Sequence, residues 1–437
     1  MLEMLKTGDQ LRTVDGKCFD VINFLGAGGQ GEVYRIRLDD TEFALKCYLP
    51  SMANSEQADA LLELVKRGPP NEQFLWPLAF VPATSSAGYG YLMALREDRF
   101  AGLEDLVLGN VHTPPSFEVL CKSAINLVLA FRTLHISGLC YKDINFGNVF
   151  LDTSTGDIAI CDNDNVRVNR QHSTQISGTA PFMAPEIWRD EADPSTDTDL
   201  HSLGVLLFYI FVRAHPLEGA LEANINIFNE AAKKQLYGNK PLFIFDPNDT
   251  SNRPVEGIHG RAATNWERYP RFFKEQFELA FTEGLLNPQR RTTTTEWIDV
   301  LSRLRDSIVT CGSCGKETFY DKERIFSAGK LKCSFCSRTT NLPSRLKLDQ
   351  HVVMLRPHTA LFPHHLGTSL EFGQPIAQVT QHPSDPNRWG ITNLGTSPWS
   401  FETSDGSIRE LPAGKTVLLR NNLKINFGAV EGIVRVI

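Results

Sequence analysis

The stretch that decides the fold is Tyr141-Lys142-Asp143-Ile144-Asn145-Phe146-Gly147-Asn148. An apolar segment with helical periodicity, 117–136, precedes it, and the apolar run 149–151 follows it as a strand candidate. Acidic and amide residues are common in loops, so the composition of the stretch alone indicates little. Its position between a helix and a buried strand makes an ordinary loop the weaker interpretation.

Four further motifs extend outward from this stretch in a fixed order. They are Gly26-Ala27-Gly28-Gly29-Gln30-Gly31-Glu32-Val33, Ala44-Leu45-Lys46, Asp162-Asn163-Asp164 and Ala184-Pro185-Glu186. Each is weak alone, since a G-x-G-x-x-G pattern also occurs in plain glycine-rich turns. Five motifs in one order are hard to obtain by chance. At these residues the chain resembles the eukaryotic-type protein kinase family, over roughly residues 10–305.

The resemblance implies a site for ATP and Mg²⁺ between two lobes. Glycines allow backbone N–H groups to approach phosphates because they lack a Cβ atom, although a plain hairpin turn is the alternative. The implied nucleotide-binding residues are Gly26, Gly28 and Gly31 over the phosphates, Val33 over the base, and Met93 and Leu95 in the hinge segment.

Lys46 is the point charge that would meet the α and β phosphates. A carboxylate on the following helical stretch, 57–66, is expected to hold this lysine in place. Spacing favours Glu63 for that role, with Glu56 as the rival.

Three polar residues complete the implied catalytic set. Asp143 would orient the substrate hydroxyl and accept its proton, while Asn148 and Asp162 would hold Mg²⁺. Thr179 would hydrogen-bond near Asp143, which predicts serine/threonine rather than tyrosine specificity. Two scaffold features are also implied. Glu186 would pair with Arg291, and the helix that begins near Asp199 would anchor the catalytic loop.

Three positions depart from the family pattern. Tyr141-Lys142 stands where the family has His-Arg, and Lys142 keeps a positive charge that could read a phosphate, less rigidly than Arg. Asn145 replaces a lysine that steadies the γ-phosphate. Asp162-Asn163-Asp164 replaces Asp-Phe-Gly. The metal ligand Asp162 is kept. Asn163 cannot supply the buried apolar side chain of the family's Phe, and Asp164 adds a second carboxylate that could favour a divalent metal.

Composition places the chain among soluble globular proteins. Its 437 residues predict about two to three domains. A net charge of −7 does not favour a protein that coats nucleic acid. Residues 1–13 show no apolar signal segment, and the longest apolar run, 203–212, is shorter than the ~20 residues of a membrane span. A cytoplasmic protein without a membrane partner is therefore expected.

Four of the nine cysteines form the pattern Cys311-x-x-Cys314 and Cys333-x-x-Cys336. Without a secretion signal, this spacing favours a structural Zn²⁺ site with four thiolates over disulfides or an iron centre. The surrounding residues 303–349 are rich in Lys and Arg, which raises the possibility of nucleic-acid binding. Few aromatic residues suited to base stacking occur there, so a solvated or docking surface is the favoured interpretation.

From residue 346 the chain carries short strand candidates at 351–355, 375–380, 389–391, 416–420 and 432–437. Turn signals at 385–387, 404–406 and 413–414 separate them, which predicts a small all-β domain. The stretch Trp389-Gly390-Ile391-Thr392-Asn393-Leu394-Gly395 distantly resembles forkhead-associated domains. The Gly-Arg and Ser-x-x-His phosphate contacts of that family are not evident, so any small β-sandwich is an equal alternative.

The sequence thus predicts an α+β chain, with a bilobal protein-kinase fold followed by a zinc ribbon and a small all-β sandwich. The expected boundaries are 1–96 for the N-lobe, 97–307 for the C-lobe, 308–345 for the ribbon and 346–437 for the sandwich. The expected function is ATP/Mg²⁺-dependent phosphorylation of protein serine and threonine, and the alternative is a pseudokinase scaffold. Resemblance to bacterial stress and tellurite-resistance kinases implies two partners besides the protein substrate, a metal-dependent protein phosphatase and a von Willebrand A-type protein.

Overall fold

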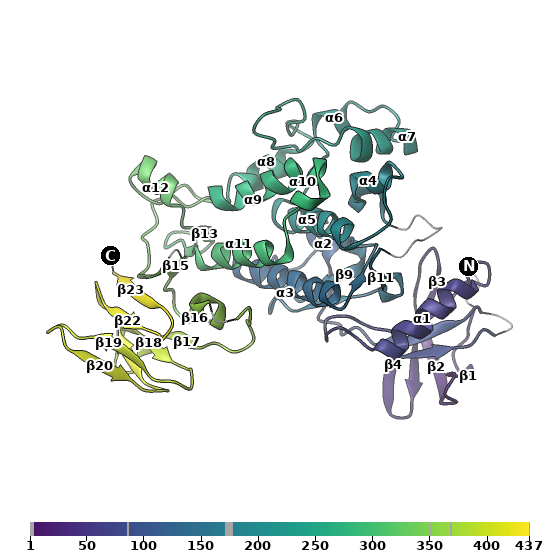
Figure 1. The fold of residues 1–437 in the computed structure, drawn as a ribbon, viewed down its shortest axis with the longest axis horizontal. Helices are drawn as coiled ribbons and strands as arrows, with labels where there is room; N and C mark the ends of the chain where they lie inside the picture. Colours follow the sequence, from purple (N-terminus) through teal and green to yellow (C-terminus); the bar gives the residue numbers. More distant parts are fainter. Residues whose placement is uncertain (1–3, 85–86, 171–177, 350, 368, 437) are drawn as a thin grey trace. The chain divides into compact units, whose positions relative to one another are not determined.

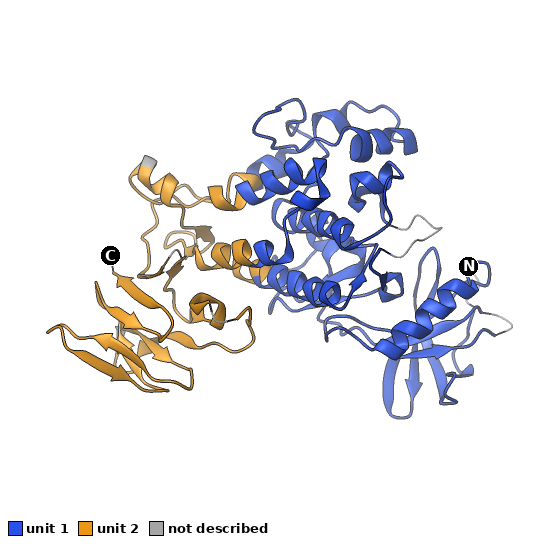
Figure 2. Ribbon diagram, viewed as in Figure 1, with its two compact units in different colours: residues 1–115, 122–265, 275–298 blue, residues 116–121, 266–274, 299–437 orange. Residues whose placement is uncertain are grey.

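The computed structural model describes residues 4–84, 87–170, 178–349, 351–367 and 369–436. They form two compact units, shown in blue and orange in Figure 2. The first unit comprises Met1–Pro115, Lys122–Asn265 and Glu275–Ile298, and the second comprises Ser116–Cys121, Trp266–Lys274 and Asp299–Ile437.

The first unit begins with an antiparallel six-stranded sheet in the order β1-β2-β3-β4-β6-β5. The strands are β1 (Gln10–Arg12), β2 (Cys18–Ala27), β3 (Gly31–Leu38), β4 (Thr41–Tyr48), β5 (Ala79–Val81) and β6 (Gly90–Ala94). The strands predicted at 19–25, 33–38 and 43–48 are therefore confirmed. In the register, Lys46 of β4 lies opposite Val33 on one side and Tyr91 on the other. This register places the lysine in the middle of the sheet.

Helix α1 (Ser55–Arg67) packs on this sheet. The side chain of Asn54 caps its first turn by accepting from the Gln57 N–H at 2.9 Å, and Gly68 with φ of +73° ends it. Leu61 of α1 shares a buried cluster with Ala44, Tyr91 and Met93 of the sheet. The apolar face of α1 therefore lies on β4 and β6, and its acidic residues are left for the other faces.

The rest of the first unit is mainly helical (Figure 1). Its elements are α2 (Leu103–Leu108), most of α3 (Phe117–Ile136), α4 (Pro185–Trp188), α5 (Thr196–Val212), α6 (Ala220–Ala223), α7 (Glu230–Lys233), η4 (Lys234–Asn239), α8 (Gly260–Trp266), part of α9 (Arg271–Phe281), α10 (Glu283–Leu286) and the start of α11 (Thr294–Asp306). Short strands β7 (Ala101–Gly102), β8 (Leu139–Cys140), β9 (Val149–Leu151), β10 (Ile158–Ile160) and β11 (Arg167–Val168) support the loops between them. The apolar run 203–212 lies within α5, and most of its side chains are buried.

One helix among the described residues, α3, is long and apolar enough to cross a membrane. The core helix of a globular protein passes the same test of length and composition. More than half of the most apolar stretch of α3 is buried within the protein, including Val128, Phe131 and Leu134.

The second unit contains the cysteine-rich segment and two further sheets. The segment holds β12 (Ile308–Thr310), β13 (Glu317–Phe319) and α12 (Lys322–Ala328). One sheet has the order β15-β14-β23-β22-β19-β20, with strands His351–Met354, Arg345–Leu348, Glu431–Arg435, Lys424–Asn426, Trp399–Glu402 and Ile408–Leu411. The other has the order β16-β17-β18-β21, with strands Ala360–Leu361, Ala377–His382, Asp385–Asn393 and Thr416–Leu418.

Side chains from both sheets form one buried core, which includes Leu346 and Val434 from the first sheet and Val379 and Ile391 from the second. The turns predicted at 404–406 and 413–414 are confirmed. The turn predicted at 385–387 is wrong, because β18 already begins at Asp385 and pairs with His382. The connection is the shorter pair 383–384, so the reversal comes two residues earlier than the Asp-Pro-Asn signal indicated.

Candidate active site

The ammonium group of Lys46 lies between two carboxylates. Its Nζ atom is 3.3 Å from Oδ1 of Asp162 and 3.1 Å from each carboxylate oxygen of Asp164. Burial alone would lower the pKa of Lys46, but the carboxylates of Asp164 and Asp162 more than offset it and the pKa is raised. Lys46 therefore stays charged, and the predicted closeness of Lys46 and Asp162 is found.

Asp164 is the most enclosed carboxylate of this group, with 1% of its side chain exposed. Besides Lys46, it accepts hydrogen bonds from the hydroxyl groups of Tyr91, at 2.8 Å, and Tyr48. Both oxygens are therefore engaged by protein donors. Burial would raise the pKa of Asp164, but Lys46 and the two tyrosines hold it below the usual value. The expectation that this second carboxylate favours a divalent metal does not fit these bonds.

Asn163 is fully buried between Asp162 and Asp164. Its amide nitrogen donates to the backbone oxygens of Leu75, at 2.8 Å, and Ile160, at 2.9 Å. The expected loss of an apolar plug is thus compensated by two hydrogen bonds that fix the residue to its surroundings.

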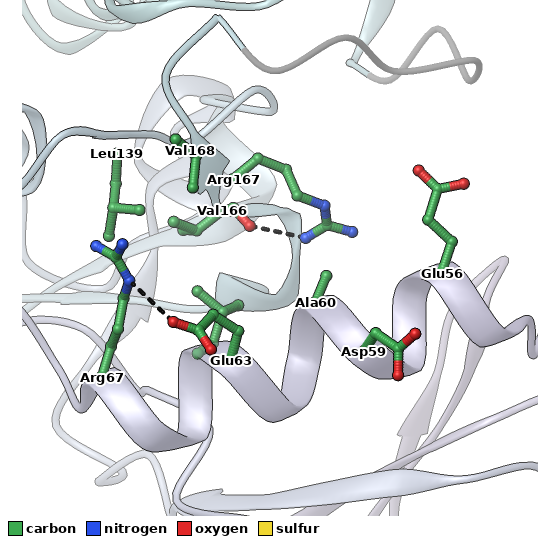
Figure 3. A pocket seen from close by; sticks show the side chains of 10 residues that line it. Glu56, Asp59, Ala60, Glu63, Arg67, Leu139, Val166, Arg167 and Val168 are labelled. Carbon is green, nitrogen blue, oxygen red and sulfur yellow. Dashed lines mark hydrogen bonds and ion pairs between the residues drawn. The ribbon is translucent and has the colours of Figure 1, made fainter.

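Glu63 does not reach Lys46, so the expectation that α1 supplies the lysine's partner is wrong. The Glu63 carboxylate is 57% exposed and lies 3.7 Å from the guanidinium of Arg67, one turn along the same helix. Glu56, the rival, is also exposed. Figure 3 shows both acids on a face of α1 that borders a pocket of about 310 Å³, which Arg167 also lines. Glu63 was selected by its distance in sequence from the following strand. That distance gave no information on the direction in which its side chain points.

The loop 141–148 brings the predicted catalytic residues together. Asp143 Oδ1 accepts from the backbone N–H of Thr179 at 2.7 Å and from its hydroxyl at 2.8 Å, which confirms the predicted contact. The Asn148 amide nitrogen donates to the Asp143 backbone oxygen at 3.1 Å and lies 3.4 Å from its carboxylate. This orientation leaves the amide oxygen of Asn148 as the atom that can face a cation.

Asn145 is turned onto its own loop. Its amide nitrogen donates to the backbone oxygen of Asp143 at 3.0 Å, and its amide oxygen accepts from the Gly147 N–H at 2.8 Å. The residue therefore shapes the loop, and it carries no charge to replace the lysine of the family pattern.

Two predicted scaffold contacts are confirmed. Asp199 on α5 accepts from the backbone N–H groups of Tyr141 at 2.6 Å and Lys142 at 3.1 Å, and so fixes the start of the catalytic loop. Glu186 and Arg291 form a two-pronged ion pair, with both N–O distances 2.7 Å. Such bidentate pairs are among the stronger charge-assisted contacts in proteins.

The glycines of the loop between β2 and β3 differ in their surroundings. A Cβ atom on Gly31 would lie 2.0 Å from the backbone oxygen of Cys47, so close strand packing alone demands glycine there. A Cβ atom on Gly26 or Gly28 would meet no atom of the described residues within 4 Å. Packing within the protein therefore does not require glycine at these two positions. The free space beside them suits the approach of a phosphate to the backbone.

Val33, predicted to lie over the base, shares one apolar cluster with Met93 and Leu95, predicted in the hinge segment. Met93 and Ala44 are buried in it, and Val33 and Leu95 are partly buried against it. The strand register brings Met93 of β6 opposite Ala44 of β4, and Leu61 of α1 packs in the same cluster.

Comparison with known proteins agrees with this arrangement. Residues 19–298 match the protein kinase domain family. The match spans more than half of the chain, and the chain belongs to this family.

Three similar relatives are kinases by name, and two of the names specify serine/threonine. They are "Ribosomal protein S6 kinase alpha-4" of Mus musculus, 27% identical over 251 residues (51% of this chain, 30% of the relative); "Serine/threonine-protein kinase SCH9" of Saccharomyces cerevisiae, 30% identical over 200 residues (44% and 23%); and "Serine/threonine-protein kinase sck2" of Schizosaccharomyces pombe, 32% identical over 202 residues (44% and 30%). The chain thus spans less than a third of the length of these relatives.

A second candidate site lies in the cysteine-rich segment. The sulfur atoms of Cys311, Cys314, Cys333 and Cys336 all lie within 4.8 Å of one another, and the pairs 311/336 and 314/333 are each 3.7 Å apart. Four thiolates around Zn²⁺, each about 2.3 Å from the ion, would be separated by about 3.8 Å. A disulfide requires about 2.05 Å, so the geometry fits a metal and not a pair of disulfides.

Two similar turns present these sulfurs. The Gly315 N–H donates to the Cys311 backbone oxygen at 2.9 Å, and the Ser337 N–H donates to that of Cys333 at 2.9 Å. Gly315 and Ser337 both have positive φ, +71° and +60°. The matching turns place two sulfurs each on the shared site, which is the arrangement of a closed structural zinc site.

Proposed function

We propose that the chain is an ATP- and Mg²⁺-dependent serine/threonine protein kinase that transfers the γ-phosphate to protein hydroxyl groups. The observation that carries the proposal is the convergence of Lys46 and Asp162, 3.3 Å apart, with the Asp143–Asn148 pair. Burial and the nearby carboxylates of Asp164 and Asp143 raise the pKa of Asp162 against the effect of Lys46. A cluster of acids that share one lysine suits a site built for a cation and a polyphosphate.

Each residue has a defined task in this proposal. Asp162 and the amide oxygen of Asn148 would hold Mg²⁺. When bound, this ion would neutralise negative charge on the phosphates. Lys46 and the open glycines Gly26 and Gly28 would position the phosphates. Asp143 would orient the hydroxyl of the protein substrate and take its proton.

Thr179 supports the choice of serine and threonine as substrates. It donates two hydrogen bonds to Asp143 and so fixes the carboxylate from the substrate side of the loop. Two of the relatives named above also carry the description serine/threonine-protein kinase.

A pseudokinase scaffold is the second candidate. Asn145 favours it, since its side chain bonds its own loop and brings no charge toward a γ-phosphate. A scaffold would bind nucleotide, or nothing, and would act through the second unit.

We assign the Cys311/Cys314/Cys333/Cys336 cluster to structural Zn²⁺ in a zinc ribbon, on the strength of the sulfur spacing. We also propose domain boundaries at 1–96, 97–307, 308–345 and 346–437, with a forkhead-associated-like sandwich in the last of these domains. Its two sheets around one core support the sandwich. A bacterial stress role, with a metal-dependent phosphatase and a von Willebrand A-type protein as partners, rests on resemblance alone.

The two functions are separated by incubation of the chain with ATP and Mg²⁺, followed by mass spectrometry of the peptides that span 162–186. A kinase that phosphorylates itself would gain phosphate on serine or threonine. Ser173, Thr174 and Ser177 are candidate acceptors and lie outside the described residues. Nucleotide binding without phosphate on this chain or on added protein substrates would favour the scaffold.

A further inference from the structure

We infer that Asp164 is the positioning residue for Lys46, in the role expected of a carboxylate on α1. The inference rests on the proposed function, because the position of Lys46 matters for phosphate transfer. It concerns a residue that stands where the kinase pattern has glycine.

Asp164 makes closer contact with Lys46 than the two other candidate carboxylates, Asp162 and Glu63. Lys46 Nζ is 3.1 Å from both oxygens of Asp164, a two-pronged contact, and 3.3 Å from one oxygen of Asp162. Glu63 is engaged with Arg67 at the surface. The side chains of Lys46 and Asp164 are 7% and 1% exposed, whereas that of Asp162 is 43% exposed. Asp164 is therefore the buried partner of Lys46, and the carboxylate of Asp162 remains partly accessible to solvent.

The surroundings of Asp164 are built for a permanent negative charge. A buried carboxylate is costly unless hydrogen bonds satisfy its oxygens. Tyr91 donates to one oxygen and Tyr48 to the other, and Lys46 contacts both. The ammonium of Lys46 also lies 5.6 Å from the centre of the Tyr48 ring. These donors come from β4 and β6, so the sheet itself prepares the acceptor site.

Asp164 also links the lysine to the metal ligand. Asp162 and Asp164 belong to one short turn, in which Asp162 precedes the 3-10 segment η2 (Asn163–Asn165). Asn163, between them, is fixed to the backbone of Leu75 and Ile160. The holder of Lys46 and the ligand for Mg²⁺ therefore form one anchored piece of chain. Both carboxylates that bind Lys46 therefore come from this turn and not from α1.

A kinetic comparison of three variants tests the inference. Asp164→Asn removes the charge while it keeps the size, Asp164→Glu keeps the charge, and Glu63→Gln removes the α1 carboxylate. We expect kcat for phosphate transfer to fall at least tenfold in Asp164→Asn, partial recovery in Asp164→Glu, and a change below twofold in Glu63→Gln. Unchanged kcat in Asp164→Asn, or an equal loss in Glu63→Gln, would overturn the inference.

A second readout does not depend on catalysis. The rate at which an amine-selective acylating reagent modifies Lys46 at pH 8 can be measured by peptide mass spectrometry, with the surface residue Lys122 as internal standard. Loss of one of two carboxylates lowers the pKa of an ammonium group, so Lys46 should react at least fivefold faster relative to Lys122 in Asp164→Asn. Glu63→Gln should leave the ratio unchanged. A ratio that rises in Glu63→Gln and not in Asp164→Asn would overturn the inference.

The two readouts also separate this inference from the proposed function. If the wild-type chain transfers no phosphate but the labelling ratio rises only in Asp164→Asn, the kinase proposal fails and the pairing of Lys46 with Asp164 stands. If Asp164→Asn does not fold, as judged by its melting curve, the decision passes to Asp164→Glu and Glu63→Gln. A kcat below the wild-type value in Asp164→Glu, with kcat in Glu63→Gln unchanged, then supports the inference. A wild-type kcat in Asp164→Glu, or a larger loss in Glu63→Gln, overturns it.

Discussion

At the scale of single residues, the candidate site depends on side chains that are fixed by hydrogen bonds or ion pairs to named partners. Asp143 is held by Thr179, Asn148 by Asp143, and Lys46 by Asp162 and Asp164. Such fixed geometry is what phosphate transfer requires, because positioning and charge stabilisation supply most of the catalysis.

Asn148 is predicted to act through the cation. Asn148→Ala removes an oxygen ligand, so the Mg²⁺ concentration needed for half-maximal activity should rise at least about tenfold, the lower end of the effect seen when groups that support metal ligands are lost. A Mg²⁺ titration of phosphate transfer measures this. Asn126→Ala is the matched control, since the Asn126 amide bonds Gly156 and not the catalytic loop. An identical titration for Asn148→Ala and the wild type would contradict the role.

The hydroxyl of Tyr91 is predicted to stabilise the fold through Asp164. Tyr91→Phe removes a 2.8 Å bond to a buried carboxylate, and hydrogen bonds to charged groups contribute about 1.5–3 kcal/mol. Urea unfolding should show a loss of that size. The control is Tyr89→Phe, whose hydroxyl bonds the neutral oxygens of Asn54 and Gln57 and should cost about 1 kcal/mol. Equal losses in the two variants would count against a special role for the carboxylate.

At the scale of elements, the Glu186–Arg291 pair joins the start of α4 to the segment before α11. Burial would raise the pKa of Glu186, but Arg291 holds it below the usual value. A carboxyl group with a lowered folded-state pKa contributes stability above its unfolded-state pKa of about 4.3 and loses that contribution as the pH falls through the folded-state value. The pair should therefore stabilise the unit at neutral pH and not in strong acid.

Glu186→Gln leaves the 2%-exposed side chain of Arg291 without a counter-charge. Loss of one partner of a buried ion pair costs about 3–5 kcal/mol, and chemical unfolding at pH 7 should show it. The difference from the wild type should shrink as the pH is lowered below about 4. Glu283→Gln, which breaks an exposed pair with Arg290, should cost less than about 1 kcal/mol. A pH-independent difference would contradict the assignment.

The elements also show how far sequence reasoning extends. The strands β2, β3 and β4 could be predicted because their apolar residues alternate around glycine and charged turns. The contacts of Asp143 with Thr179 and of Glu186 with Arg291 followed from the motifs. The partner of Lys46 did not, since the face of α1 that meets the sheet depends on tertiary packing. Tyr48 and Tyr91, the donors that complete the Asp164 site, lie in strands more than 70 residues away in sequence. The sequence signal that could have identified this partner of Lys46 was the acidic residue Asp164 at a position where the family has glycine.

At the scale of the whole molecule, two units carry different chemistry. The first holds the residues that we propose for phosphate transfer, and the second holds the four-cysteine cluster. Apolar alternation identified five of the short strands from residue 345 onward and missed β14, β16, β19, β20 and β22. Strands of two to four residues carry little periodic signal, so which of them are found depends on the apolar residues and turn signals that happen to flank them.

The cysteine site is predicted to contain one Zn²⁺ per chain. Elemental analysis of purified protein should show this stoichiometry, and a strong chelator should lower the thermal stability of the second unit, because metal binding of about 10 kcal/mol or more is lost. Cys333→Ser should reproduce the effect, while Cys18→Ser, a change at an exposed cysteine of the first unit, should not. Metal-free protein of unchanged stability would contradict the assignment.

We propose that Lys46, Asp143, Asn148 and Asp162 together form a working phosphate-transfer site. The most direct measurement is transfer of label from γ-labelled ATP to protein serine and threonine in the presence of Mg²⁺, for the wild type and Asp143→Ala. We expect transfer by the wild type and a loss of about 10²–10⁴-fold in the variant, with the melting curve unchanged. Asp157→Asn, at a half-buried carboxylate bound to Arg99 and Lys122, should retain full activity. Equal transfer by the wild type and Asp143→Ala, or none by the wild type, would contradict the claim.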